Sequence, residues 1–245
     1  MGPGLGADAP PRNDRANIAR SIPREAEMTT LLITGFGRFP GAPSNPTAAI
    51  VRDLIRRRRP ALAAHRLVGH VFETCWEAVD RDLPMLVDRE RPEIVVLLGV
   101  ATRADRVRLE LVARNRRTIL FPDAGGARSD VIRIAPGAPF FRPGRFPVAR
   151  LAAALRRGGL VPALSRNAGG YLCNYAYWRA LDAAQVPGGP RLVVFVHVPP
   201  LHRLRDGGRS PSPTSRRPAG RRLVTAHDRL VTGLEHLLVA ALAHP

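Results

Sequence analysis

The segment Glu93-Ile94-Val95-Val96-Leu97-Leu98-Gly99 is a short, uninterrupted run of apolar residues that ends at a glycine. A run of this length without alternation is typical of a strand that is covered on both faces, as in the centre of a parallel sheet. We therefore expect residues 93–99 to form a central strand with other elements packed above and below it.

Strands and helices alternate on both sides of this segment. Apolar or alternating runs predict the strands, and amphipathic runs predict the helices between them. The expected strands are residues 31–34, 66–72, 107–113, 162–165 and 191–198, and the expected helices are residues 45–59, 76–89, 148–155, 173–185 and 224–243. This order predicts a three-layer α/β/α sandwich with a largely parallel, mixed central sheet and a phosphorylase/hydrolase-like architecture.

The composition fits one domain with a sizeable core. The chain has 245 residues, of which 45% are hydrophobic and 5% aromatic, so aliphatic side chains must fill that core. The formal net charge is +18, and all 38 basic residues are arginine. This charge permits binding to an anionic partner, but no basic motif with interleaved aromatic residues accompanies it. Specific binding to nucleic acid is therefore not expected.

Composition also sets the expected limits of the domain. Residues 1–27 contain four prolines and no apolar run, which predicts a disordered extension rather than a secretory leader. We expect Met28 to be the true start and a single domain to occupy residues 28–245. Residues 203–221, rich in Arg, Ser, Pro and Gly, are expected to form a mobile loop. Because no run of about 18 apolar residues exists, we expect no membrane span and a cytoplasmic protein with reduced thiols.

The segment Asn167–Tyr175, with the sequence NAGGYLCNY, indicates a reactive cysteine. A glycine pair followed by a helical apolar pattern places Cys173 in the first turn of a helix. The unpaired backbone N–H groups of a first turn favour a thiolate over a thiol. The alternative is that Cys173 is a small buried apolar residue, as most free cysteines are.

His197 and Glu110 are candidate partners for this cysteine. His197 lies near the carboxyl end of the strand predicted at 191–198, where open α/β sheets place their sites. A cysteine beside a histidine can attack an acyl carbon, and a carboxylate such as Glu110 can orient the imidazole. The alternatives are a hydrogen-bonded structural histidine and a solvated strand carboxylate.

Phe36 and Phe39 lie in a glycine-rich loop after the first predicted strand. The spacing of its glycines and the position of Pro40 exclude a dinucleotide-binding loop. The two rings therefore either line an apolar pocket or cover the edge of the sheet.

Four segments share their order and pattern with one known family. They are Thr34–Pro46 (TGF…NP), Glu93–Gly99, Ala168–Asn174 (AGGYLCN) and Phe195–Pro199 (FVHVP). On these motifs the chain resembles pyroglutamyl peptidase I, also called pyrrolidone carboxyl peptidase, a family of cysteine peptidases. The resemblance covers about residues 29–243, and the last two motifs are the most specific.

The resemblance implies a cysteine exopeptidase that removes N-terminal pyroglutamyl residues from peptides. It implies that Cys173 is the nucleophile, that His197 is its base and that Glu110 completes the triad. It also implies that Phe36 and Phe39 contact the pyrrolidone ring, that the substrate is a peptide with a blocked N-terminus, and that the chain forms a homo-oligomer. No metal or organic cofactor is implied, because no Cys/His cluster has metal-ligand spacing.

Three positions depart from the family pattern. Val100 and Leu120 stand where the family has Gln and Arg, and Leu111 stands where an Arg follows the catalytic glutamate. Losing one oxyanion donor costs about two to three orders of magnitude in rate. The alternative function is therefore a non-peptidase or altered-specificity homologue that binds a peptide or an anionic partner. A nucleoside phosphorylase-like activity would rest on architecture alone, which does not assign function.

Overall fold

The apolar segment at residues 93–99 forms β3 (Ile94–Val100), an interior strand whose first six residues are buried. The computed structural model describes residues 1–2, 28–39, 41–57, 59–205 and 224–244. Both faces of β3 are covered, so the prediction of a central strand is confirmed.

Six strands form the main sheet in the order β2-β1-β3-β8-β4-β7. The strands beside β3 are β1 (Thr30–Phe36), β2 (Arg66–Phe72), β4 (Arg108–Glu110), β7 (Ala163–Ser165) and β8 (Leu192–Val198). The pairs among β2, β1, β3 and β8 are parallel, whereas β4 pairs antiparallel with β8 and parallel with β7. The predicted largely parallel, mixed sheet is therefore confirmed.

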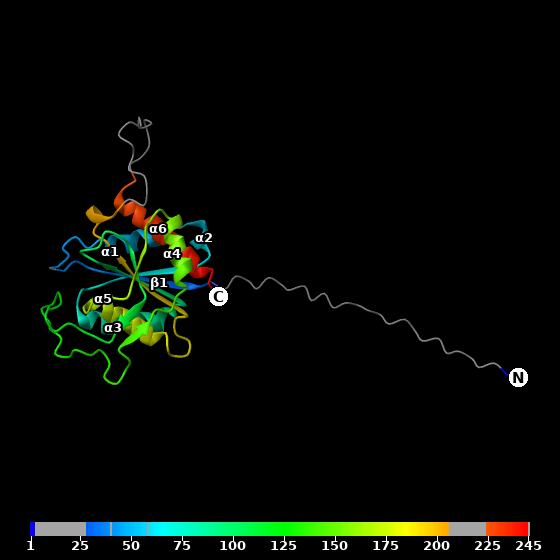
Figure 1. Ribbon diagram of the computed structural model, residues 1–245, viewed down its shortest axis with the longest axis horizontal. Coiled ribbons are helices and arrows are strands. Elements are labelled where there is room, and N and C mark those ends of the chain that lie inside the picture. The colour runs from blue at the N-terminus through cyan, green and yellow to red at the C-terminus, as the bar shows by residue number, and fades with distance from the viewer. Residues whose placement is uncertain (3–27, 40, 58, 206–223, 245) are drawn as a thin grey trace, which may run out of the picture.

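Helices cover both faces of this sheet, which confirms the three-layer α/β/α sandwich (Figure 1). One layer contains α1 (Thr47–Arg56), α2 (Pro60–Ala63), α4 (Val148–Arg157) and α6 (Ala226–Leu242), and the other contains α3 (Trp76–Glu90) and α5 (Leu172–Ala183). Alternate strand residues pack into opposite layers, as Leu31 and Leu32 do. Each helix layer thus has its own apolar core on one face of the sheet.

The segment predicted as one strand at residues 107–113 is instead two strands in two different sheets. After β4, the chain continues as β5 (Val112–Arg114), which pairs with β6 (Phe141–Pro143) in a separate two-stranded sheet. Leu111 lies between them, donating its N–H to Ser165 O and accepting from Gly144 N–H. The prediction was wrong because apolar and charged residues alternate from Val107 to Leu111, past the end of β4, so the pattern does not reveal that the chain changes partners.

Two predictions fall largely outside the described residues. The extension 1–27 and the start at Met28 stay predictions. The loop expected at 203–221 is described only as far as residue 205, and its first residue, Arg203, ends the short 3-10 helix η1 (Leu201–Arg203). Of the helices in the described part of the chain, none has the length and hydropathy needed to cross a membrane.

Candidate active site

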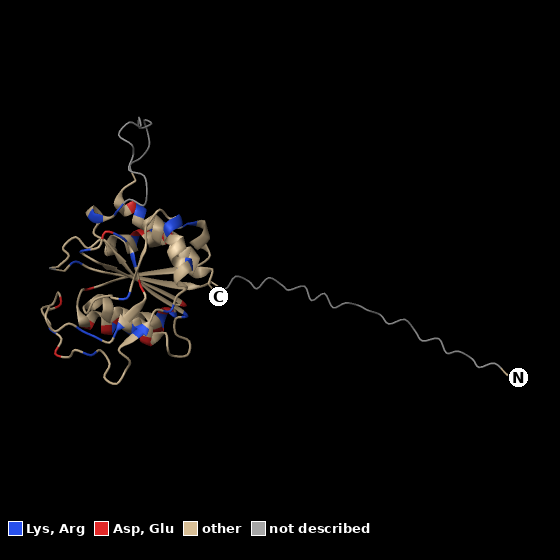
Figure 2. Ribbon diagram, viewed as in Figure 1, with Lys and Arg blue, Asp and Glu red and all other residues tan. Residues whose placement is uncertain are grey.

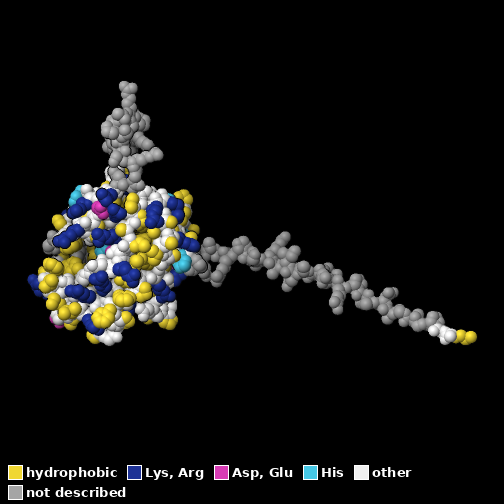
Figure 3. All heavy atoms as spheres, in the orientation of Figure 1, with side chains coloured by type: hydrophobic (Ala, Val, Ile, Leu, Met, Phe, Trp, Pro, Cys, Tyr) yellow, Lys and Arg dark blue, Asp and Glu magenta, His cyan; other side chains and the backbone are white. Residues whose placement is uncertain are grey.

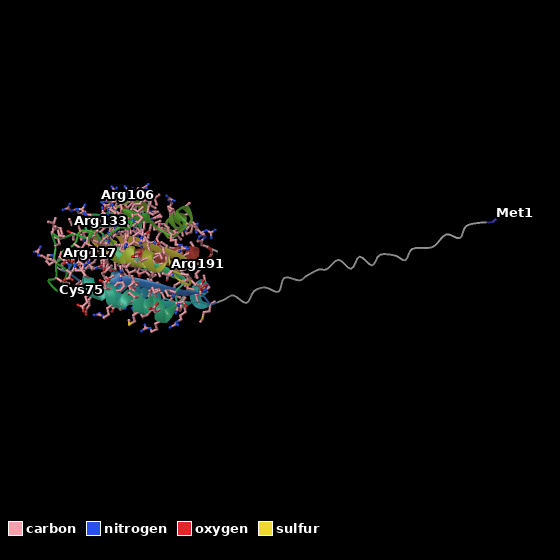
Figure 4. The ribbon with its side chains drawn as sticks, turned by 90° about the horizontal axis from the view of Figure 1, so that it is seen from below. Met1, Cys75, Arg106, Arg117, Arg133 and Arg191 are labelled. Carbon is pink, nitrogen blue, oxygen red and sulfur yellow. The ribbon has the colours of Figure 1, made fainter. Side chains whose placement is uncertain are left out.

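The carboxyl ends of β3 and β8 meet the first turn of α5 at one end of the sheet. The register of β3 with β8 pairs Gly99 with His197, and Cys173 is the second residue of α5. In Figure 4, Cys75 and Arg117 lie toward this end of the molecule, and Arg191, just before β8, lies toward the other. Open α/β sheets place their sites at the carboxyl ends of the strands.

Cys173 lies directly against the backbone of β3. A Cβ atom added at Gly99 would lie only 2.7 Å from Cys173 Sγ and 2.8 Å from Phe195 Cζ. Glycine is therefore needed at this position for the sulfur to reach the sheet. Cys173 Sγ thus faces Gly99, the strand position that pairs with His197. Cys173 itself lies in the first turn of α5, where backbone N–H groups have no helical partner.

We expect Gly99→Ala to disturb the site more than a glycine replacement elsewhere. The added methyl group overlaps Cys173 Sγ, so the free energy of unfolding in urea should fall by about 1–3 kcal/mol. The rate at which iodoacetamide alkylates Cys173 should also differ from that of the unmodified protein. Gly37→Ala is the matched control, because its Cβ would meet only Phe72 O, at 3.5 Å. Equal stability and equal Cys173 reactivity in the two variants would contradict the close contact.

Glu110 and His197 form a buried pair. Glu110 Oε1 lies 2.7 Å from His197 Nδ1, and the side chains are 0% and 8% exposed. Glu110 lies on β4 opposite Phe195, and β8 and β7 flank β4 on its two sides. The reading of Glu110 as a solvated strand carboxylate is therefore wrong. Because Nδ1 faces Glu110, Nε2 is the imidazole nitrogen left for Cys173.

Cys173 and Glu110 together keep His197 protonated. Burial by itself would lower the pKa of His197, but hydrogen bonds and charges from Cys173 and Glu110 raise it to about 9. Burial would likewise raise the pKa of Glu110, but the hydrogen bond and charge of His197 hold it below its ordinary value. At neutral pH the pair is therefore an imidazolium and a carboxylate.

An apolar hollow of about 330 Å³ adjoins the start of α5. Its lining residues are Phe39, Gly41, Phe121, Pro122, Asp123 and Tyr171. The rings of Phe39 and Tyr171 are 5.9 Å apart, and the Tyr171 hydroxyl donates a hydrogen bond of 2.9 Å to Pro122 O. Tyr171 directly precedes α5, the helix whose second residue is Cys173, so the hollow lies at the same end of this helix as the cysteine.

The two loop phenylalanines occupy different environments. Phe39 lines the hollow, whereas Phe36 is buried, with its ring 5.6 Å from that of Phe72. Thr47 Oγ1 accepts from Phe36 N–H and donates to Phe36 O, which ties the end of β1 to α1. Phe36 thus anchors the loop that carries Phe39 and is not among the residues lining the hollow.

Sequence patterns did not single out Phe121, Tyr171 or Asn174 as site residues. The Asn174 side chain is buried, accepts from Arg114 N–H, and donates to the carbonyl oxygens of Arg114 and Arg116. These three bonds hold Arg114 at the end of β5, and Arg116 just after it, against α5. The available signal was a polar residue directly after a cysteine at a helix start, where an apolar residue would suit the core better.

The departures from the family pattern leave the site with fewer polar side chains. Val100 ends β3 half-buried, and Leu120 is 69% exposed on the loop that carries Phe121. Within the described ranges, no group of three or more His, Cys, Asp and Glu side chains could hold a metal ion.

A family model described as pyroglutamyl peptidase matches residues 29–212. The chain belongs to the pyroglutamyl peptidase family. Two relatives of this family member carry the name pyrrolidone-carboxylate peptidase. The one from Thermococcus litoralis is 30% identical over 172 residues, which cover 70% of this chain and 77% of the relative. The one from Gloeobacter violaceus is 32% identical over 177 residues, covering 70% and 82%.

A solved structure shows the same fold for this pyroglutamyl peptidase family member. The pyrrolidone carboxyl peptidase of Thermococcus litoralis superposes with a TM-score of 0.73 at 25% identity. The superposition covers 89% of this chain and 94% of the solved chain. The family and the α/β fold expected from the sequence motifs are therefore both confirmed.

Proposed function

We propose that this chain is a cysteine exopeptidase that removes an N-terminal pyroglutamyl residue from peptides. The observation that carries the proposal is the buried Glu110–His197 pair beside Cys173, next to an apolar hollow. A pyroglutamyl ring has no free α-amino group, so it needs an apolar slot with amide hydrogen bonds rather than a carboxylate. Phe39 and Tyr171 supply that slot.

In the proposed reaction, Cys173 Sγ attacks the carbonyl carbon of the peptide bond that follows the ring. A C–S bond forms, and the carbonyl oxygen takes up the negative charge. His197 gives a proton to the leaving amine as the C–N bond breaks, and a thioester remains. Water then gives a proton to His197 and attacks the thioester carbon. The C–S bond breaks, pyroglutamic acid leaves and loses its proton to solvent, and Cys173 is regenerated beside the His197 imidazolium.

The roles of the supporting groups follow from their contacts. Glu110 orients the His197 imidazole and stabilises its positive charge. Because Val100 and Leu120 bring no polar side chain, stabilisation of the oxyanion falls to backbone N–H groups at the first turn of α5. The proposed substrate is a peptide with a blocked N-terminus. The cytoplasmic location and the homo-oligomer stay predictions.

The test is hydrolysis of pyroglutamyl-coumarin amide by the purified protein under reducing conditions, beside prolyl-coumarin amide. We expect release of coumarin from the pyroglutamyl compound alone, because prolyl has a charged ring nitrogen in place of the lactam and an apolar slot disfavours it. No release from the pyroglutamyl compound, or equal release from both, would contradict the proposal.

A further inference from the structure

We propose that a hollow beside His197 receives the first residue after the pyroglutamyl group, and that Arg103 and Arg108 favour a carboxylate on that residue. This inference rests on the proposed function and adds a substrate class to it. The class is peptides in which the residue after the ring carries a carboxylate, on its side chain or at its C-terminus.

The hollow has a volume of about 250 Å³ and is distinct from the apolar one. Its lining residues are 100–104, Arg108, 167–169 and His197. His197 is the proton donor to the leaving amine in the proposed reaction. The residue that bears this amine must therefore lie within hydrogen-bond reach of His197, and so at the wall of this hollow.

Strand register places Arg108 beside the proton donor. In the antiparallel pair of β4 and β8, Arg108 is the direct partner of His197. Side chains of directly opposed residues point to the same face of a sheet, with Cβ atoms about 4.5–5.5 Å apart. The Arg108 side chain thus leaves the sheet beside that of His197, and Arg103 lines the same hollow from the loop after β3.

These arginines have no carboxylate partner among the described residues. The nearest acidic residues by sequence are occupied, because Asp105 pairs with Arg106 and Arg205, and Glu110 pairs with His197. The hollow is therefore lined by two arginines without a carboxylate partner in the described part of the chain and by His197, whose partner is Glu110. A substrate carboxylate would form charge-assisted hydrogen bonds with these arginines.

Arginine is abundant in this chain, so its presence in a hollow does not by itself indicate a binding site. Figure 2 shows basic residues in many parts of the ribbon, and the face drawn in Figure 3 carries many basic and few acidic side chains. The inference depends on the register of Arg108 with His197. It also depends on a neighbouring hollow that shares Asn167 and Gly169 with the hollow beside His197. Arg114 and Arg116 line that second hollow, so the cationic wall continues away from His197.

The experiment compares kcat/KM for four blocked dipeptides: pyroglutamyl-Glu-amide, pyroglutamyl-Gln-amide, pyroglutamyl-Arg-amide and pyroglutamyl-Gln with a free C-terminus. We expect the Glu amide to exceed the isosteric Gln amide by roughly tenfold and the Arg amide to be slowest. An advantage of the free-acid Gln peptide over its amide assigns the hollow to a terminal carboxylate, and an advantage of the Glu amide assigns it to a side chain.

Variants separate this local effect from attraction by the net charge. Arg103→Gln/Arg108→Gln should bring the ratio of carboxylate to neutral substrate close to one. Arg52→Gln/Arg156→Gln, which removes the same charge from α1 and α4, should keep the wild-type ratio. Equal rates for all four peptides, or the same ratio in both double variants, would overturn the inference and leave the peptidase proposal standing. Cleavage of none of them would overturn both.

Discussion

Replacement of Cys173 by alanine is expected to lower kcat/KM for pyroglutamyl-coumarin amide by at least roughly 10⁴-fold. The proposed reaction passes through a thioester on this sulfur, and removing a nucleophile leaves only the catalysis provided by binding and oxyanion contacts. The measurement is the initial rate of coumarin release at equal concentrations of folded protein.

Cys75→Ala is the matched control for this variant. Cys75 is the other cysteine of the chain, it is also free, and it lies just before α3. Its loss should leave the rate within about twofold of the unmodified protein, because Cys75 is only half-buried and alanine removes no more than its sulfur. Comparable losses in the two variants would show that Cys173 is not a specific nucleophile.

Replacement of Glu110 by glutamine is expected to produce the second large effect. Glutamine keeps the shape of the side chain but removes the charge that holds the His197 imidazolium. The rate at neutral pH should fall roughly 10²- to 10⁴-fold. Glu235→Gln is a fair control, since Glu235 is a second buried glutamate. It lies on α6, and its Oε2 is 2.9 Å from Arg59 Nε. This variant should change stability without this loss of activity per folded molecule.

The pH dependence gives the same variant a second readout. The pKa of His197 is raised to about 9, so the imidazolium persists below that pH and is lost as the pH rises through it. Activity should therefore fall on the alkaline side near pH 9. In Glu110→Gln, burial still lowers the pKa of His197 while one of the groups that raises it is gone, so this fall should move to lower pH. An unchanged alkaline limb would contradict the assigned role of Glu110.

The elements with strong local patterns could be predicted from the sequence. β2 has the predicted bounds of residues 66–72, and Cys173 lies in the first turn of a helix as its glycine pair indicates. In both cases the signal lies within one short segment: an apolar pattern for the strand, and a glycine pair before the helix. The family motifs also lie in such segments, which is why they could be read before the fold was known.

The parts of the site that depend on distant contacts could not be predicted in the same way. The burial of Glu110 results from β4 lying between β8 and β7, strands that follow it by more than fifty residues. The apolar hollow brings together Phe39, Phe121 and Tyr171 from three separate segments. No local pattern records which loops close over one another, so these features follow only from the three-dimensional arrangement.

The most direct test of the central claim is to trap the acyl-enzyme. The protein is mixed with a pyroglutamyl substrate, quenched in acid within the first turnover, and analysed by peptide mass spectrometry. We predict one pyroglutamyl group in thioester linkage on the peptide that contains Cys173, and no adduct in Cys173→Ala. Coumarin release without any adduct on Cys173, or an adduct on Cys75 instead, would contradict the account.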